Sequence, residues 1–590
     1  MKNTLYCKMK ITGCFFLLFS FLLVSCGSKG MNDIHSISDV FYKSQFEKLY
    51  PDFSKKELEL ALQNHFSDTS LIDKFYKSNG YESVWVKDTF DVVRIDTLLY
   101  YLNNSVNHGL KPDMFAAKTI KALRDSVMTG SFSDSMPALY TALARLEKQA
   151  TKAVQQYAYG MRYGFIDVKK VFPHDYHIPL QNPDSVFHEF VFGNIDSRLV
   201  YLLQEVQPKD SIYALLQREL QYYRALSDTT FGLIPLKDPK KVFKLKDSDS
   251  QVMPLIAKRL MLTGELPHTE KADSVYKTLS PELMNAINVF RLNNSYPEDD
   301  RELGKKTIDA LNRPMSYYAN KLVANLERYR WKRQTALPEK YVEVNIAAFH
   351  LVAVEPGYPT LKMNVCGGIP FKNQTPLLES AISYINLNPT WSVPRSIVEK
   401  EIYYLVKKNP DYFKKNNMQV TRNGKRVNTD SIDWSQFNNP KTFPFSVRQD
   451  PGNGNALGRI KFMFSNPFSV YLHDTPSKNA FNYTMRGVSH GCVRIQKPMD
   501  FAFFCLANKD SLYYDRLRYS VDQAPLSKKG KEFLKQGKLT KLPDIVNLAD
   551  FVPLFIDYFT VYALPKERKL YFSDDVYGFD ERINKELGKY

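Results

Sequence analysis

The spacing of apolar residues divides the chain into a helical part and a β-rich part. Apolar side chains recur at helical spacing in residues 142–157 and 215–223, which predicts amphipathic helices there. Residues 341–346 alternate apolar and polar side chains as half-buried strands do, and residues 350–354 follow as a second strand. We therefore predict an α+β multidomain protein in which the helical region comes first.

Three short helical segments lie between these two parts. They cover residues 256–263, 283–291 and 304–312, and Gly264 is a typical stop after the first of them. A small three-helix domain is therefore predicted over about residues 251–320.

One long polar stretch interrupts the β-rich part. Residues 395–446 are rich in Lys and Asn, and residues 400–408 predict a helix near the start of this stretch. A long insertion of this kind is often a lid or a binding loop, and the alternative is a passive surface excursion. Further on, residues 498–508 predict a helix that begins with proline, and residues 552–564 predict a strand that returns to complete the sheet.

The beginning of the chain has the pattern of an export signal. An apolar run at residues 15–24 follows three lysines and is too short to span a membrane, so residues 1–25 predict a secretory signal peptide. Cys26 ends a Leu-Val-Ser-Cys sequence that resembles a bacterial lipobox, and residues 26–40 form a polar tether. We expect lipidation of Cys26, with an ordinary signal peptide or a short anchor helix as the alternatives.

The charge of the chain is strongly positive. The formal charge is +17, and +14 remains after the three lysines of the predicted signal peptide are removed. A basic surface favours anionic partners, although an excess of Lys and Arg also simply keeps a protein soluble. No DNA- or RNA-binding signature accompanies the charge, so we expect no nucleic-acid partner.

Three cysteines remain once the signal peptide and Cys26 are set aside. They are Cys366, Cys492 and Cys505, and their odd number leaves at least one free thiol in an oxidising compartment. Cys366 and Cys505 are interpreted as two separate buried thiols, with a disulfide between them as the alternative. The sequence offers no CxxC pair and no fourth ligand for zinc, so we expect no metal.

Cys492 lies in the segment Ser489-His490-Gly491-Cys492-Val493-Arg494, which suits a nucleophile better than a packing residue. Nearby positive charge or an imidazole favours the reactive thiolate. Gly491 lets the backbone approach a substrate carbonyl closely, where an adjacent N–H could face a developing oxyanion.

His473, nineteen residues earlier, is the candidate base. Residues 468–473 alternate as a half-buried strand does, which would place Ser469, Tyr471 and His473 on one face. A neighbouring strand carrying Cys492 would then complete a nucleophile and base on paired strands.

This constellation resembles the signature of L,D-transpeptidases with a YkuD-type catalytic domain: a histidine, fifteen residues, then Ser-His-Gly-Cys and an arginine. Residues 386–394, 448–452, 455–462, 471–476 and 574–578 also resemble the large periplasmic members of that family. The resemblance covers most of the mature chain and is strongest between residues 340 and 510.

The resemblance implies a domain plan. It consists of a lipoprotein signal peptide 1–25, a tether 26–40, a helical scaffold domain 41–250, a peptidoglycan-binding-like domain 251–320, a catalytic domain 340–510 with a lid insertion 395–446, and a C-terminal extension 511–590 that completes the catalytic domain. The turn at residues 294–300 lacks the glycine-rich sequence usual in the family, which leaves glycan binding by residues 251–320 open.

The chemistry that the resemblance implies is acyl transfer on peptidoglycan stem peptides. Cys492 would attack the carbonyl of the third residue of a donor tetrapeptide, releasing the terminal D-alanine and leaving a thioester. The side-chain amine of an acceptor stem would resolve the thioester into a 3→3 cross-link. His473 would carry the proton, and neither metal nor organic cofactor is implied.

Further residues have supporting roles in this scheme. The N–H groups of Gly491 and Cys492 are candidates for the oxyanion hole, and the backbone carbonyl of Asp474 is the candidate that orients His473. Arg494 would bind a substrate carboxylate, with a local salt bridge as its alternative.

Ser489 and His490 are expected to shape the site, and no role is given to Tyr471. Carbapenem-type inhibitors are expected to acylate the cysteine.

Two other function classes stay open. One is an L,D-carboxypeptidase or a cysteine peptidase of wall peptides, in which water or another acceptor replaces the stem amine. The other is a non-catalytic peptidoglycan-binding lipoprotein. In every case the expected location is a bacterial cell envelope, with a lipid anchor in the outer membrane facing the periplasm; the membrane leaflet and the oligomeric state are left open.

Overall fold

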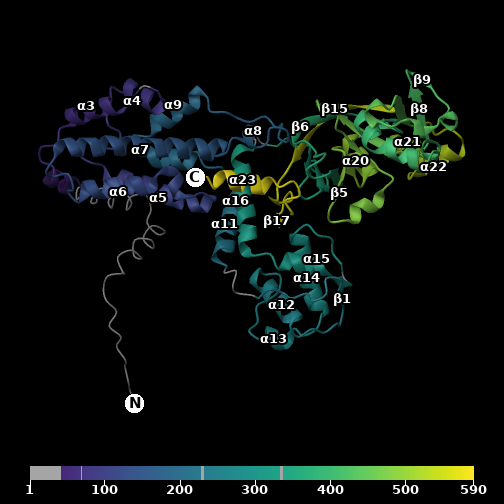
Figure 1. Ribbon diagram of the computed structural model, residues 1–590, viewed down its shortest axis with the longest axis horizontal. Coiled ribbons are helices and arrows are strands. Elements are labelled where there is room, and N and C mark those ends of the chain that lie inside the picture. The colour runs from purple at the N-terminus through teal and green to yellow at the C-terminus, as the bar shows by residue number, and fades with distance from the viewer. Residues whose placement is uncertain (1–41, 68, 227–231, 300, 333–336, 590) are drawn as a thin grey trace, which may run out of the picture. The chain divides into compact units, whose positions relative to one another are not determined.

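The computed structural model describes residues 42–67, 69–226, 232–299, 301–332 and 337–589 (Figure 1). The predicted signal peptide, tether and Cys26 lie outside these residues. The described residues form two compact units: unit 1 comprises those within 42–165, 181–209 and 587–589, and unit 2 comprises those within 166–180 and 210–586.

Unit 1 is helical. Its longer helices are α3 (Lys55–His65), α4 (Leu71–Ser78), α5 (Val92–Asn103), α6 (Ala117–Met128), α7 (Met136–Tyr163), α9 (Ser185–Asn194) and α10 (Leu199–Glu205). The long helix α7 packs against α3, α5 and α6 (Figure 1). It begins at the cap residue Ser135 and ends at Gly164, whose φ is +93°. The helical spacing predicted for residues 142–157 is thus confirmed.

A buried carboxylate helps to hold unit 1 together. Glu147 of α7 is fully buried and accepts hydrogen bonds from the Tyr76 hydroxyl at 2.6 Å and from the backbone N–H of Trp85 at 2.7 Å. Burial raises the pKa of Glu147, and these donors partly offset that effect.

The predicted three-helix region is present in unit 2. It consists of α12 (Val252–Leu262), α14 (Pro281–Asn293) and α15 (Lys305–Leu311), with the short α13 (Ala272–Val275) between the first two. These helices share a core that includes Ile256, Ile287 and Leu311. A two-stranded ribbon of β1 (Phe243–Lys244) and β2 (Glu302–Leu303), which the sequence did not predict, closes this region.

The predicted helical domain 41–250 does not coincide with unit 1. Helix α11 (Ser211–Ala225) packs instead on α16 (Met315–Trp331), and both helices belong to unit 2. Leu216 and Leu220 of α11 share a core with Leu322 of α16. The amphipathic helix predicted in residues 215–223 is therefore confirmed. The helix on which its apolar face packs, α16, lies about a hundred residues further along the chain.

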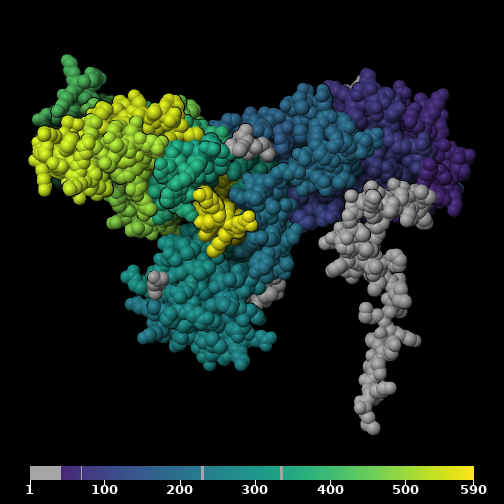
Figure 2. Space-filling model, turned by 180° about the vertical axis from the view of Figure 1, so that it is seen from behind, coloured from purple at the N-terminus to yellow at the C-terminus, as the bar shows by residue number. Residues whose placement is uncertain are grey.

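The C-terminal helix α23 (Phe579–Leu587), yellow in Figure 2, also packs on α16. Asp580 of α23 is buried and accepts from Arg328 at 2.5 Å and from Lys321 at 3.3 Å. These two cations lower the pKa of Asp580 against the opposing effect of burial.

A nine-stranded sheet forms the centre of the described C-terminal region. Its strands, in spatial order, are β13 (Gly487–Ser489), β5 (Leu361–Gly368), β14 (Val493–Ile495), β12 (Leu472–His473), β11 (Ile460–Phe464), β6 (Leu378–Leu387), β15 (Ile545–Asp557), β3 (Tyr341–Asn345) and β4 (His350–Val354). Strand β4 also pairs with β5, so the ladder closes on itself.

The predicted returning strand corresponds to β15. It begins at Ile545, seven residues before the predicted start at Val552. Residues before and after an irregularity between Asn547 and Val552 both pair with β6, so they form one strand. It runs parallel to β3 and antiparallel to β6, in the interior of the sheet. The predicted helix at residues 498–508 is α20 (Pro498–Cys505), three residues shorter than expected.

The predicted lid insertion has a fold of its own. A four-stranded sheet of β7 (Trp391–Ser392), β10 (Phe445–Gln449), β8 (Met418–Arg422) and β9 (Lys425–Arg426) accompanies α17 (Arg395–Ile397), a π-helical turn (Val398–Ile402), α18 (Tyr403–Lys408) and α19 (Tyr412–Lys415). The helical stretch thus begins five residues before the predicted Lys400. A buried core around Trp434, Phe443 and Val406 shows that the insertion is folded.

The remaining α-helices and strands of the described residues all belong to unit 2. They are α8 (Val168–Val171), α21 (Ser511–Ser520), α22 (Lys528–Lys535), β16 (Val561–Tyr562) and β17 (Tyr571–Phe572). Within the described residues, no helix has the length and apolar character required to cross a membrane.

Candidate active site

The predicted cysteine and histidine segments meet in the sheet. Strand β12, which ends at His473, runs parallel to β14, which begins one residue after Cys492. The register places His473 opposite Arg494. Cys492 itself lies in the loop between β13 and β14, so the prediction that it sits within a paired strand is corrected by one residue.

The strand predicted for residues 468–473 is shorter than expected. Only Leu472 and His473 are in β12, and Ser469 has a φ of +56°, which interrupts extended structure. The cause is Asn466, whose side-chain oxygen accepts from the N–H groups of Phe468 and Val470, each at 3.0 Å. The side chain of Asn466 thereby replaces strand pairing with a turn.

The loop that carries Cys492 is fixed by Ser489. The Ser489 hydroxyl donates to the backbone oxygen of Cys492 at 2.5 Å and accepts from the N–H of Gly491 at 3.1 Å. Gly491 has a φ of +112°, a conformation that side-chain-bearing residues rarely adopt. The Gly491 N–H is therefore engaged by Ser489 in this conformation, which favours the Cys492 N–H as the oxyanion donor.

The thiol of Cys492 is half-buried, and its surroundings act on its pKa in opposite directions. Burial raises the pKa, whereas hydrogen bonding with Tyr471 and the charges of Lys461 and Arg494 lower it. Burial has the larger effect, so the net pKa is raised. The expected effect of neighbouring positive charge is present, because Lys461 and Arg494 favour the thiolate, but burial outweighs it.

His473 is neutral at physiological pH, so one of its ring nitrogens has a free lone pair. It is 5% exposed, and burial together with the nearby Arg494 charge lowers its pKa to about 3. Its Nδ1 lies 2.5 Å from the backbone oxygen of Asp474, as the sequence predicted. That contact orients the ring with Nδ1 as the donor and leaves Nε2 as the basic nitrogen.

The carboxylate of Asp474 has a different task. It accepts from the backbone N–H of Arg459 at 2.9 Å and of Thr475 at 2.7 Å, and it pairs with Lys478. These bonds hold the turn after His473 in place.

Tyr471 and Lys461 belong to the site although the sequence did not indicate a role for them. The Tyr471 side chain hydrogen-bonds with Cys492, and its ring centroid lies 5.5 Å from that of His473. Lys461 of β11 is opposite His473 in the ladder, and its Nζ lies 3.8 Å from the Tyr471 ring centroid. Burial lowers the pKa of Lys461. The only sequence signal for a role of Lys461 is its position in β11, where it lies between two buried apolar residues.

Arg494 has an unused donor close to the reacting centre. Its Nε is buried and has no hydrogen-bond partner among the described residues. A buried guanidinium N–H without a partner is costly, and a ligand carboxylate would satisfy it. Cys366 lies in β5, opposite Arg494 of β14. Cys366 is buried, and burial raises the pKa of its thiol.

A contact between Glu401 and His490 joins the predicted lid insertion to the cysteine loop. Glu401, in the π-helical turn of the lid, lies 2.6 Å from Nε2 of His490, two residues before Cys492. Both side chains are partly exposed to solvent. Single-turn π-helices occur frequently at functional sites.

Comparison with known proteins agrees with this geometry. Residues 339–511 match the YkuD family, described as the L,D-transpeptidase catalytic domain, and residues 70–220 match the family described as the Scaffold domain. The chain contains an L,D-transpeptidase catalytic domain. A curated protein of Haemophilus influenzae named "Putative L,D-transpeptidase" is 29% identical over 295 residues, which are 48% of this chain and 54% of the relative. The chain thus spans about half the length of that relative.

The transpeptidase domain as matched contains every residue of the candidate site, from Glu401 of the lid to Arg494. Helical residues that precede it match the Scaffold domain, in agreement with the predicted helical N-terminal region. The three cysteines of the described residues are free thiols, and among them Cys366 and Cys505 are buried.

Proposed function

We propose that this protein is an L,D-transpeptidase that forms 3→3 peptidoglycan cross-links through a thioester on Cys492. The observation that carries the proposal is the arrangement of a half-buried thiol, a neutral buried imidazole fixed by a backbone carbonyl, and a buried arginine N–H without a partner. A nucleophile beside an oriented base is the arrangement that covalent acyl transfer requires.

The reaction begins with a neutral pair. As the Cys492 sulfur bonds to the carbonyl carbon of the third stem residue, Nε2 of His473 takes the thiol proton. The Cys492 N–H faces the developing oxyanion. Collapse of the tetrahedral species breaks the bond to the terminal D-alanine, whose amine receives the proton from His473, and a thioester remains.

The acceptor stem then reverses these steps. Its side-chain amine attacks the thioester carbon, His473 removes a proton from that amine, and the sulfur leaves as the thiol once the proton returns to it. Arg494 would hold a carboxylate of the bound peptide through its unused Nε–H. If water replaces the amine, the same residues give an L,D-carboxypeptidase.

The test is product analysis with purified protein and tetrapeptide-containing muropeptides. Transpeptidation predicts release of D-alanine together with a 3→3 dimer. Tripeptide without a dimer would indicate the carboxypeptidase, cleavage at another bond would indicate a wall-peptide peptidase, and binding without any product would indicate the non-catalytic protein.

We further propose that the protein is a lipoprotein of the bacterial envelope, anchored through Cys26 in the outer membrane and facing the periplasm. The support is the lipobox-like sequence that ends at Cys26. Replacement of Cys26 by Ala should abolish acyl modification and leave the protein soluble or unprocessed. Extraction of the wild-type protein from membranes by salt alone would contradict the anchor.

A further inference from the structure

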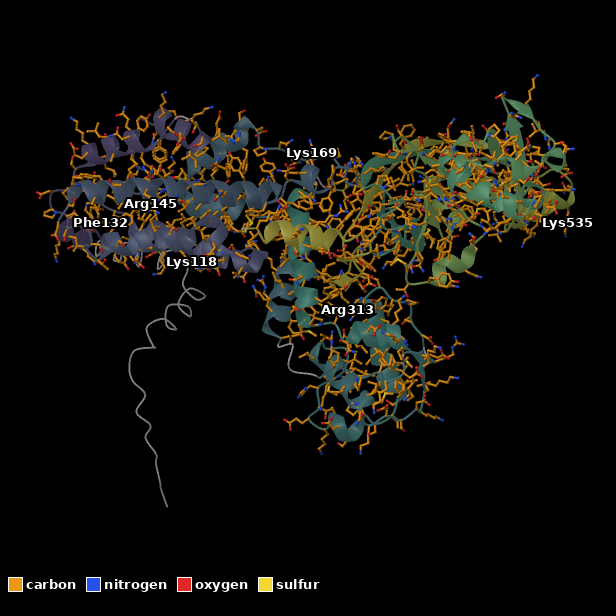
Figure 3. The ribbon with its side chains drawn as sticks, viewed as in Figure 1. Lys118, Phe132, Arg145, Lys169, Arg313 and Lys535 are labelled. Carbon is orange, nitrogen blue, oxygen red and sulfur yellow. The ribbon has the colours of Figure 1, made fainter. Side chains whose placement is uncertain are left out.

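A polar cavity in unit 2 lies apart from the residues of the active site. Its volume is about 180 Å³, and it is bordered by α11, α12, α14, α16 and the segment around β17. This volume is enough for several water molecules or for one small ligand. None of its lining residues belongs to the candidate active site. Arg313, labelled in Figure 3, lies between α15 and α16 and is not among the residues that line the cavity. It pairs with Asp574 at 2.7 Å.

Positive charge predominates around this cavity. Its lining contains Arg218, Arg259, Arg568 and Lys569 against the two carboxylates of Glu219 and Glu265. Arg259 is 0% exposed and donates to the backbone oxygen of Leu311 at 3.0 Å, which fixes its guanidinium at the wall. Burial raises the pKa of Glu265, and hydrogen bonds from Thr263 and Asn293 oppose that effect.

Two buried polar atoms of the lining have no hydrogen-bond partner among the described residues. One is the hydroxyl of Tyr318, a residue that is 1% exposed, and the other is Oδ1 of Asn293. The Asn293 amide nitrogen donates to Glu265 at 3.1 Å, which fixes the orientation of the amide. Its oxygen is therefore left as an acceptor. A buried polar atom without a partner is costly unless a ligand or water occupies the site.

The two atoms require different chemistry from an occupant. The Tyr318 hydroxyl can donate to an anion, and the surrounding cations favour one, whereas Asn293 Oδ1 requires an N–H or O–H donor. An amino acid or the carboxyl end of a peptide carries a carboxylate beside an N–H group and satisfies both requirements. We propose that this cavity is a second binding site, for an amino acid or a peptide carboxyl terminus.

The test uses full-length protein with Cys492 replaced by Ala, so that neither probe is consumed. D-alanine and a stem tetrapeptide are each titrated by calorimetry into this protein and into the same protein with Tyr318→Phe. Loss of one hydrogen bond to a carboxylate should weaken binding about tenfold. Tyr222→Phe is the matched control, because Tyr222 neighbours the cavity residue Tyr223 but its hydroxyl donates to the backbone of Leu262.

The outcomes separate the possible occupants. Saturable binding of D-alanine identifies a free amino acid site, and binding of the tetrapeptide alone identifies a wall-peptide site; either result supports the proposal if Tyr318→Phe weakens it and Tyr222→Phe does not. A second variant, Arg568→Gln, changes only an exposed side chain and should also weaken binding.

Absence of binding, or equal affinity in all variants, would mean that the cavity holds only water and would overturn the proposal. Because Cys492→Ala keeps the groups that bind the donor stem, tetrapeptide that binds with equal affinity in all variants is assigned to the active site, and that result leaves the proposed transpeptidase function untouched.

Discussion

The chemistry of individual residues in the site depends on a balance between burial and charge. Burial raises the pKa of the Cys492 thiol more than Tyr471, Lys461 and Arg494 lower it. The resting state is therefore a neutral thiol beside a neutral imidazole, because the pKa of His473 is lowered to about 3. This state differs from a preformed thiolate–imidazolium pair, and it makes proton transfer part of the attack on the substrate.

The first prediction concerns the Tyr471 hydroxyl. Tyr471→Phe removes a hydrogen bond that lowers the pKa of Cys492, so the thiolate fraction at pH 8 should fall by several-fold. The rate of iodoacetamide alkylation against pH measures this change. Tyr483→Phe, at a residue that is 62% exposed, is the control. Identical pH profiles for Tyr471→Phe and the wild-type protein would show that Tyr471 does not affect the pKa of Cys492.

The second prediction concerns stability in acid. The pKa of His473 is about 3 in the folded state and near its ordinary value of 6.5 when unfolded. Between these values the unfolded state binds more protons, so the stabilisation that is complete above pH 6.5 is lost as the pH falls towards 3. The loss is at most about 1.4 kcal/mol per pH unit.

His473→Gln should therefore make the free energy of unfolding less dependent on pH in this window, as measured by urea titrations at several pH values. Asn182→Gln, at an exposed residue that does not titrate, should leave the slope unchanged. An unaltered slope in His473→Gln would mean that the imidazole is not held neutral by burial.

At the scale of elements, the insertion predicted to be a lid is folded, and Glu401 within it contacts His490 of the cysteine loop. Aromatic and aliphatic side chains around Trp434 give the insertion a buried core of its own. The sequence predicted an insertion at these residues, but not its core, because the apolar residues of the lid are scattered among Lys and Asn without a clear period. The π-helical turn that carries Glu401 also has no recognisable sequence pattern.

The third prediction tests this connection. Glu401→Gln removes the charge opposite His490 and should reduce turnover of the natural stem about two- to fivefold, because an exposed ion pair contributes up to about 1 kcal/mol. Alkylation of Cys492 by a small reagent should be unaffected. Glu399→Gln is the matched control, since Glu399 pairs with Arg395 inside the lid. Equal turnover in both variants would show that the Glu401–His490 contact does not matter for catalysis.

Local chemistry also explains where strand prediction failed. The alternation in residues 468–473 predicted a strand, but the Asn466 side chain accepts from the N–H groups of Phe468 and Val470, and the strand is limited to Leu472 and His473. The helices at residues 256–263, 283–291 and 304–312 were predicted because apolar spacing is a local signal, and Ser280 also caps the second of them. Pairings between distant segments, such as α11 with α16, leave no such signal in a single sequence.

At the scale of the whole molecule, one of the three thiols among the described residues differs from the other two. Cys366 and Cys505 are buried within the protein, and burial raises the pKa of each. Cys492 alone is half-buried and lies beside a base and an arginine with an unused donor. The position of the nucleophile was predictable from a short motif, whereas its reactivity depends on Tyr471 and Lys461, which the fold brings in from other segments.

The fourth prediction follows from this difference. A carbapenem should form one stable adduct per protein, on Cys492, because its strained carbonyl needs no protonated leaving group and its opened ring stays attached. Intact-protein mass spectrometry and peptide mapping identify the site. Modification of Cys366 or Cys505 with Cys492 left free would contradict the choice of nucleophile.

The most direct test of the central claim is capture of the acyl-enzyme. The protein is mixed with a stem tetrapeptide, quenched in acid within seconds and weighed by mass spectrometry. We expect the added mass of the tetrapeptide less its terminal D-alanine, mapped to Cys492 and released by hydroxylamine as a thioester is. The adduct should be absent in Cys492→Ala and form far more slowly in His473→Ala. Normal cross-linking by a folded Cys492→Ala protein would contradict the account.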